Sequence, residues 1–279
     1  MTGLLFTLQV INCQQIMAVT KAFFLLGLVT IVNGHGRLID PPSRSSAFRF
    51  GFNTPPNFLL DKQLNCGGVW NQWQVNHGRC GVCGDPYQGP RKNEAGGVYA
   101  TGTIVHTYKE GTQINVVIVN SNIIFNLFHS AEFLVKAYYL TDITAPHGGW
   151  SEFRICPNNN IHKAVTQECF DRYLLATPSG ETRYIHQREA ANITIPLVLP
   201  KGLTCSQCVL QWKWNTAHDY NCDTVTKECC KGCGPQEQFY GCADVAIIKT
   251  SSGETSSTTK TTNLPNEPVG FIPIGNNFP

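Results

Sequence analysis

The sequence has few charged residues and no clear excess of either sign. Asp, Glu, Lys and Arg make up 14% of the 279 residues, and the formal net charge is +2. Such a chain lacks the strong field with which proteins attract nucleic acid or an anionic membrane surface. We therefore expect neutral or mixed partners, with no nucleic acid and no membrane among them.

A hydrophobic run long enough to cross a membrane is also missing from the leader. Its apolar stretch, residues 22–32, is well short of the roughly 20 residues that a transmembrane helix needs. A short basic start at residues 17–21 precedes it and the pair Asn33-Gly34 ends it, which is the pattern of a cleaved signal peptide. We predict that residues 1–34 are removed on secretion to the extracellular space. Met17 is an alternative start, and an uncleaved anchor is the competing interpretation.

Cysteine is the residue type that the sequence has in abundance. Of thirteen cysteines, Cys13 lies in the leader, which leaves an even number, twelve, in the secreted chain. This predicts a disulfide framework. Three Cys-x-x-Cys pairs, at residues 80–83, 205–208 and 230–233, make structural zinc the alternative, which export to an oxidising compartment disfavours. Cys156 with Cys169 is the one pairing that the spacing suggests.

The chain changes character along its length. Residues 35–97 show no helical periodicity and are rich in Gly, Pro and Asn, which predicts long loops stapled by disulfides. Beyond residue 99, short β-like runs are separated by turn signals. These runs lie at residues 102–108, 113–119, 151–156, 192–199, 209–214 and 243–249. Their number and spacing predict an all-β fold, an antiparallel β-sandwich.

The domain is predicted to span residues 35–249. The following residues, 250–279, begin with a Ser- and Thr-rich tract that cannot bury a core, so we expect a disordered, O-glycosylated tail. Within the domain, Asn192-Ile193-Thr194 is an N-glycosylation sequon.

Residues 119–141 interrupt a predicted strand. Their removal would join residues 113–118 to 142–144 in one continuous strand that leads into the turn before His147. The genetic code allows a splice-donor-like GTAAAT at Val119-Asn120 and an acceptor-like pyrimidine tract ending in ACAG at residues 138–141. We interpret these 23 codons as a retained intron. Transcripts that all carry them would refute this hypothesis, and a lineage-specific surface loop or helix is the alternative.

Signal-peptide cleavage after Gly34 would make His35 the N-terminal residue. Its α-amino group and imidazole could then chelate one metal ion, which no internal histidine can do. An α-amine has a pKa near 7.7–8.0 and loses its proton to a metal more easily than a lysine does. Nitrogen ligands suit copper better than calcium or magnesium, which prefer oxygen.

A stable site needs a second imidazole, and seven histidines remain: His77, His106, His129, His147, His162, His186 and His218. His147 is the strongest candidate because it lies in a turn of small residues. His218 is its rival, with Asp219 beside it as a structural partner or a residue that orients a ligand. Two imidazoles and the amine would leave open positions for dioxygen or peroxide, and an aromatic side chain over the axial position would exclude water.

Further motifs accompany these histidines. They lie at residues 35–38, 41–44, 66–68, 80–85, 144–147, 153–157, 205–212 and 232–244. Together they resemble the lytic polysaccharide monooxygenases of auxiliary activity family fifteen, invertebrate enzymes that act on chitin and in some cases on cellulose. The resemblance covers residues 35–249 apart from 119–141. It implies an immunoglobulin-like or fibronectin-like sandwich with copper on a flat face.

The resemblance also implies residue roles. One copper ion, cycling between Cu(II) and Cu(I), would be held by His35 and His147, with Ala145 beside the axial position. Phe239 would be the axial aromatic, although neighbouring Tyr240 leaves the register open, and Glu237 would lie just behind the metal ligands.

The reaction implied is the hydroxylation of a ring carbon at a glycosidic bond of an insoluble polysaccharide, after which the bond breaks. An external electron donor and dioxygen or hydrogen peroxide would be required, and the enzyme is expected to act as a monomer. Trp70, Trp73 and Trp150 are candidates for stacking on sugar rings, although tryptophans are more often core residues. A non-catalytic secreted protein that binds polysaccharide or copper is the alternative. A glycoside hydrolase is a third reading, for which no pair of acids is evident.

Overall fold

The computed structural model describes residues 31–125, 147–186 and 192–250, with the backbone alone for residues 31–35 and 119–125. The chain divides into two units, Met1–Lys249 and Thr250–Pro279. Most of the predicted leader, most of the suspected insertion and nearly all of the predicted tail lie outside the described residues. Within the described ranges, no helix has the length and apolar character needed to cross a membrane.

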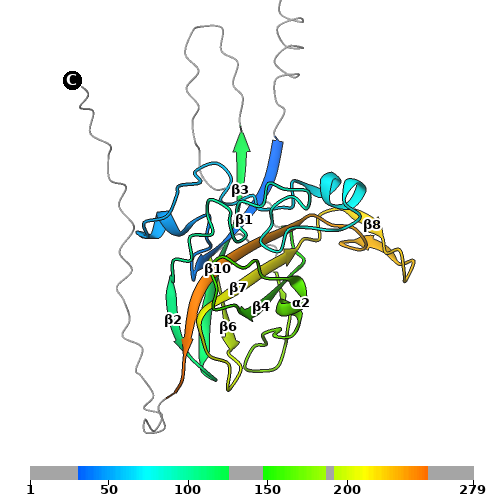
Figure 1. Ribbon diagram of the computed structural model, residues 1–279. Helices are drawn as coiled ribbons and strands as arrows, with labels where there is room; N and C mark the ends of the chain where they lie inside the picture. Colours follow the sequence, from blue (N-terminus) through cyan, green and yellow to red (C-terminus); the bar gives the residue numbers. More distant parts are fainter. Residues whose placement is uncertain (1–30, 126–146, 187–191, 251–279) are drawn as a thin grey trace, which may run out of the picture. The chain divides into compact units, whose positions relative to one another are not determined.

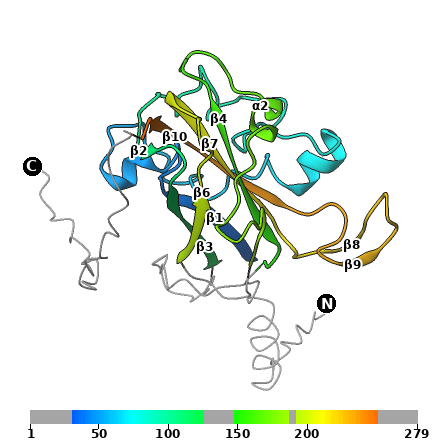
Figure 2. The same cartoon turned by 90° about the horizontal axis from the view of Figure 1, so that it is seen from below.

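Within the described residues, the first unit contains two large β-sheets and a two-stranded hairpin (Figure 1 and Figure 2). The first sheet has the order β1-β3-β6, with bounds Ile31–Asp40, Gln113–Phe125 and Asn192–Val198. The second has the order β2-β10-β7-β4-β5, with bounds His106–Lys109, Gln238–Ile248, Cys205–Asn215, Trp150–Pro157 and Tyr184–Ile185. Neighbouring strands are antiparallel, except that β2 runs parallel to β10.

The core lies between the two sheets because side chains alternate along each strand. On β7, Leu210, Trp212 and Trp214 are fully buried and belong to one hydrophobic cluster with Val116 and Ile118 of β3. The intervening residues of β7 face the other side of the sheet. The predicted all-β, immunoglobulin-like sandwich is therefore confirmed.

All six predicted strands exist, but β1, β5 and a small hairpin were not predicted. The hairpin consists of β8 (Tyr220–Cys222) and β9 (Cys229–Lys231). Strand β1 contains the sequence Asn-Gly-His-Gly-Arg, which has no apolar alternation, and the other strands have only two or three residues. Helices are short: α2 (Gln167–Asp171), the 3-10 helix η1 (Ala47–Phe50) and the π-helix η2 (Asn71–Val75).

All twelve cysteines of residues 35–279 are paired in disulfides. The pairs are Cys66–Cys80, Cys83–Cys242, Cys156–Cys169, Cys205–Cys208, Cys222–Cys229 and Cys230–Cys233. The predicted framework and the Cys156–Cys169 pairing are confirmed, and the zinc alternative is wrong for all three Cys-x-x-Cys pairs.

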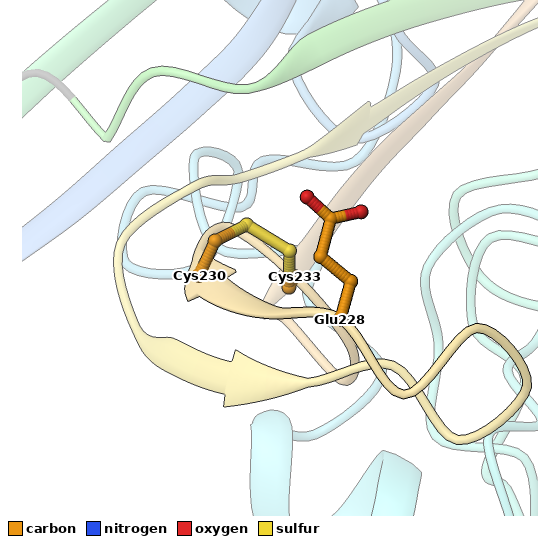
Figure 3. A group of neighbouring side chains, drawn as sticks. All are labelled: Glu228, Cys230 and Cys233. Carbon is orange, nitrogen blue, oxygen red and sulfur yellow. A yellow bond between two sulfur atoms is a disulfide. The ribbon is translucent and has the colours of Figure 1, made fainter.

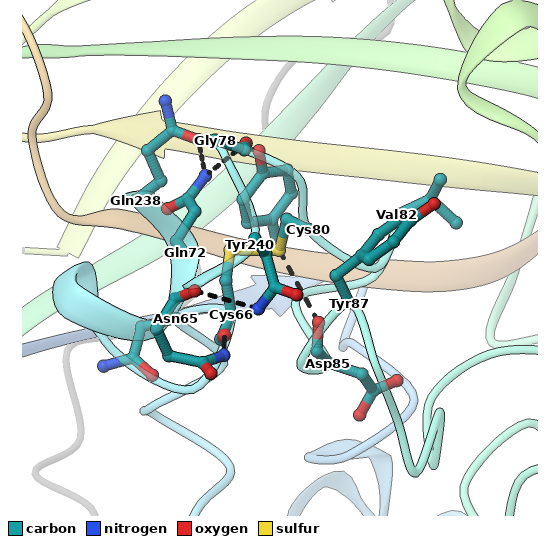
Figure 4. Close-up of a disulfide and its surroundings, with 12 residues drawn as sticks. Asn65, Cys66, Gln72, Gly78, Cys80, Val82, Asp85, Tyr87, Gln238 and Tyr240 are labelled. Carbon is teal, nitrogen blue, oxygen red and sulfur yellow. Dashed lines mark hydrogen bonds between the residues drawn. A yellow bond between two sulfur atoms is a disulfide. The ribbon is translucent and has the colours of Figure 1, made fainter. Parts of the chain in front are cut away.

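The long loops cover the outer face of the second sheet. Cys83 ties them to Cys242 of β10 across 159 residues of sequence. Figure 4 shows the Cys66–Cys80 disulfide near Tyr240 of β10, together with the hydrogen bond from Gln72 of η2 to Gln238 of β10, 2.8 Å long. The loops thereby fix η2 at the start of β10.

Strand β3 does not end where the suspected insertion begins. It continues across residue 119 to Phe125, and the backbone of residues 122–125 pairs with residues 31–34 of the uncleaved leader. His35 itself pairs with Ser121. The segment from 126 to 146 lies outside the described residues.

Candidate metal centre

His147 lies at the end of the sandwich, where the chain enters β4. Its side chain is 5% exposed. Its carbonyl accepts a hydrogen bond of 2.7 Å from Ala217, and the next carbonyl, that of Gly148, accepts one of 2.9 Å from the indole of Trp214. These two bonds fix the turn against the end of β7.

Gly149 explains why this turn is rich in glycine. Its φ is +84°, and a Cβ there would lie 2.0 Å from the carbonyl oxygen of Asn215. Only glycine allows the backbone to approach β7 so closely. Gly149 therefore allows the turn to pack against β7, and this packing fixes the position of His147 two residues earlier.

The backbone of His35, in the first sheet, also lies near Trp214. A Cβ on Gly36 would lie 3.0 Å from Cη2 of Trp212 and 3.1 Å from Cζ3 of Trp214. The centroid of the His147 ring is 6.0 Å from that of Trp214. Because consecutive Cα atoms are about 3.8 Å apart, the backbone of His35 lies beside the indole that His147 also approaches.

Phe239 completes this group. It is fully buried and lies directly opposite Trp214 in the pairing of β10 with β7, with stacked rings 5.2 Å apart. Tyr240 faces the outer side of the sheet, where its ring lies 5.8 Å from Nζ of Lys213 and burial raises the pKa of its phenol. Phe239 and Tyr240 thus lie on opposite faces of the second sheet, and Phe239 is on the same face as His147.

Glu237 precedes Phe239 and is half-buried. Its carboxylate accepts a hydrogen bond of 2.8 Å from the amide of Asn65, and its carbonyl accepts one from the backbone of Thr216. Ala145, the remaining predicted site residue, lies outside the described residues.

His218 is closer to His147 than its separation in sequence suggests. The ring centroids are 4.8 Å apart in an edge-to-face arrangement. The side chain of His218 is 57% exposed, and its Nδ1 lies 2.9 Å from Oδ1 of Asp219. The structure therefore brings both rival histidines together at the same end of the sandwich.

His186 is buried next to the same tryptophan, at a centroid distance of 5.2 Å from Trp214. The indole of Trp212 donates to the hydroxyl of Ser151, which lies 2.7 Å from Nε2 of His186. Burial lowers the pKa of His186 to about 4, so this histidine is neutral near pH 7.

Sequence reasoning missed Trp214 as the centre of this group. Gly36, His147, His186 and Phe239 all lie against it, from four different segments. The alternation of Trp212 and Trp214 in a predicted strand was the available signal, because it places both indoles on one face.

One other cluster of metal-ligating residue types occurs within the described residues. It contains Glu228, Cys230 and Cys233 on the β8–β9 hairpin. Figure 3 shows that the two sulfur atoms are bonded to each other. A disulfide has no thiolate to offer, so this cluster is a structural crosslink.

The donor set beside Trp214 fits copper. It combines a buried imidazole at His147 with the start of the predicted mature chain at His35, which would supply an amine and a second imidazole. Three nitrogen donors match copper better than hard cations. The adjacent Phe239 ring offers no ligand atom.

An exposed aromatic residue stands near this end of the sheet. Trp70 precedes η2 and is 69% exposed. The indole of Trp73 instead donates to the carbonyl of Gln236, and the ring of Trp150 is covered by the guanidinium of Arg183 at 4.0 Å. Of the three tryptophans considered for sugar stacking, Trp70 has the most accessible ring.

The sequence and the structure were compared with those of known proteins. A family model described as "Lytic polysaccharide mono-oxygenase, cellulose-degrading" matches residues 135–245. The solved structure of an AA15 lytic polysaccharide monooxygenase from Thermobia domestica in the Cu(I) state is 41% identical, with 76% of this chain and 98% of that chain covered and a TM-score of 0.65. A lytic polysaccharide monooxygenase from Kitasatospora papulosa is 17% identical over 77% of this chain and 98% of its own, with a TM-score of 0.40, too low to add to the argument. No curated protein matches.

Proposed function

Because the chain belongs to the lytic polysaccharide monooxygenases of family AA15, we propose that it is a secreted copper enzyme that oxidatively cleaves glycosidic bonds of chitin, with cellulose as its second substrate. The observation that carries this proposal is the convergence of Gly36, His147 and Phe239 on Trp214. The relative from Thermobia domestica, solved in a Cu(I) state, supports copper as the metal.

The proposal gives each site residue a role. The α-amine and imidazole of His35 and the imidazole of His147 would hold one copper ion, which would supply one-electron redox chemistry toward dioxygen or hydrogen peroxide. Phe239 fills the space beside the ligands with an apolar ring and keeps water out. Glu237, whose carboxylate binds Asn65, keeps the start of β10 in place.

Secretion is part of this proposal, since the chelate requires cleavage after Gly34. Six disulfides within residues 66–242 suit an oxidising compartment. Asn192 of the sequon is exposed at the start of β6 and is therefore accessible to glycosylation. Ala145, which lies outside the described residues, is proposed as a neighbour of the copper site.

The exposed ring of Trp70 is a candidate contact for an insoluble polysaccharide. Sugar rings stack on aromatic faces, and the accessible ring of Trp70 is tied to β10 through η2, since Gln72 binds Gln238 and Trp73 binds the carbonyl of Gln236. Trp70 is thereby held at the same end of the sheet as Phe239.

The test is product analysis. The secreted chain is incubated with chitin or cellulose, copper and a reductant, and the soluble products are identified by mass spectrometry. Oxidised oligosaccharides are expected, and only with both additives. Non-oxidised products would indicate a hydrolase, and binding without products would indicate a non-catalytic module. N-terminal sequencing of the secreted form must give His35.

A further inference from the structure

A short segment joins the strand that carries His35 to the strand that carries Phe239. It comprises residues 61–65, which we call the clasp. The carbonyl of Lys62 accepts a hydrogen bond of 3.1 Å from the backbone N–H of Gly36, and the carbonyl of Leu64 accepts one of 2.9 Å from that of Tyr240. The clasp therefore fixes β1 relative to β10 one residue away from both His35 and Phe239.

The clasp is anchored by a buried carboxylate. The side chain of Asp61 is only 2% exposed, and it accepts hydrogen bonds from Arg37 Nη1 at 2.7 Å and from Arg49 Nε at 2.6 Å. Arg49 also donates from Nη2 to the second carboxylate oxygen at 3.1 Å. Charge-assisted bonds of this kind are stronger than neutral ones, so Asp61 is held firmly by both guanidinium groups.

The two arginines come from different places. Arg49 belongs to η1, on the side of the loops. Arg37 belongs to β1 and is two residues from His35. Its bond to Asp61 therefore fixes the strand with which the predicted mature chain begins. This bond and that of Gly36 lie on consecutive residues of β1.

An anchor of this kind is needed because chain termini fray unless they are tied down. After cleavage, no residue precedes His35 to hold it, and the β3 partners of residues 35–37 are residues 119–121, inside the suspected insertion. A metal site nevertheless requires its ligands to be held within about 0.5 Å of the productive geometry.

We propose that Asp61, acting through Arg37, is a positioning residue that holds the mature N-terminus at the distance from His147 that copper binding requires. This inference rests on the proposed function. Neither side chain touches the metal. Their effect is to restrict the strand, so that the amine and the imidazole of His35 are already in place when copper arrives.

The test compares two single substitutions in the secreted chain. Arg37→Met and Arg49→Met each remove one partner of Asp61 and leave the other, so the buried carboxylate stays paired in both. The Cu(II) affinity is measured by competition with a chelator, the copper geometry by electron paramagnetic resonance, and the stability of the metal-free protein by thermal unfolding.

We expect Arg37→Met to weaken copper binding by about 10-fold to 100-fold, the usual effect of losing a residue that orients a ligand, and to alter the resonance spectrum. Arg49→Met should change the copper affinity by less than about threefold, even if it lowers the unfolding temperature as much as Arg37→Met does. Arg37→Lys keeps one charged donor and should recover part of the affinity, which keeps the test decisive if Arg37→Met folds poorly.

Two results would overturn the inference: unchanged affinity in Arg37→Met and Arg37→Lys, or equal losses in Arg37→Met and Arg49→Met. Both presuppose tight copper binding by the unsubstituted chain. If the unsubstituted chain binds no copper, the proposed function itself fails. This outcome differs from the two results above, so the two failures are distinguishable.

Discussion

The imidazole rings of His147 and His218 meet edge to face, with centroids 4.8 Å apart. Their surroundings differ, since His147 is buried whereas the side chain of His218 is 57% exposed and pairs with Asp219. Proximity alone does not say which ring binds copper. The position of His147 against Trp214, beside the backbone of His35, favours His147 as the ligand.

His147→Ala should therefore abolish oxidative turnover and lower the copper affinity by more than about 100-fold, because a three-nitrogen site would lose one donor. His218→Ala should retain both within about threefold. Isothermal titration with copper and product analysis on chitin would check this. The reverse pattern would transfer the ligand role to His218.

Gly36→Ala should destabilise the domain. The new Cβ would lie 3.0 Å from Trp212 and 3.1 Å from Trp214, closer than most side-chain contacts, and overpacking of this kind costs about 1–3 kcal/mol. Denaturant unfolding would measure the loss. As a control, Asn115→Ala at an exposed position of β3 should stay within about 0.5 kcal/mol. Equal stability of Gly36→Ala and the parent would show that β1 adjusts freely.

Removal of residues 119–141 should stabilise the domain. On β3, Ile114, Val116 and Ile118 are buried at alternate positions, and the next position of this alternation is Asn120. The deletion places Ile143 there instead. Burying one such side chain contributes on the order of 2 kcal/mol, so the melting temperature should rise by about 4–8 °C.

A matched control exists for this deletion. Removing residues 119–140 shifts the register by one and places Asp142 at the inward position, which a sheet with one buried face should not tolerate. This variant should be less stable than the chain without residues 119–141. If both deletions unfold at the same temperature, the idea that residues 142–144 continue β3 once the insertion is removed is wrong.

Stability should fall with acid because of His186. The pKa of this buried histidine is lowered to about 4, below the ordinary value of 6.5, since burial penalises the charged ring. Above pH 6.5 both the folded and the unfolded states are neutral at this group. Between pH 6.5 and about 4, only the unfolded state takes up a proton, so the free energy of unfolding decreases by an amount on the order of 3 kcal/mol.

Chemical unfolding at a series of pH values would measure this slope. His186→Gln should remove most of it, whereas His162→Gln, at an exposed position, should leave it unchanged. An unaltered slope in His186→Gln would mean that other groups cause the acid sensitivity.

Local patterns in the sequence were sufficient for much of the fold. Alternating apolar residues predicted six strands, because a strand with one buried face needs an apolar side chain at every second position. The even cysteine number after removal of the leader predicted disulfides, and the short separation of Cys156 and Cys169 identified one pair. The signal-peptide pattern pointed to His35 as a chelating residue, since this chemistry depends only on which residue begins the mature chain.

The tertiary structure decided which distant residues meet. Trp214 is at the centre of the candidate site because β7 is the middle strand of its sheet. Cys83 forms a disulfide with Cys242, which is 159 residues away in the sequence. Strand β1 escaped prediction because its sequence has no apolar alternation, and its hydrogen-bond partners in β3 and in the clasp are distant in sequence. Asp61 and Arg37 lie 24 residues apart, and no local pattern signals their contact, because long-range pairing depends on how the whole chain packs.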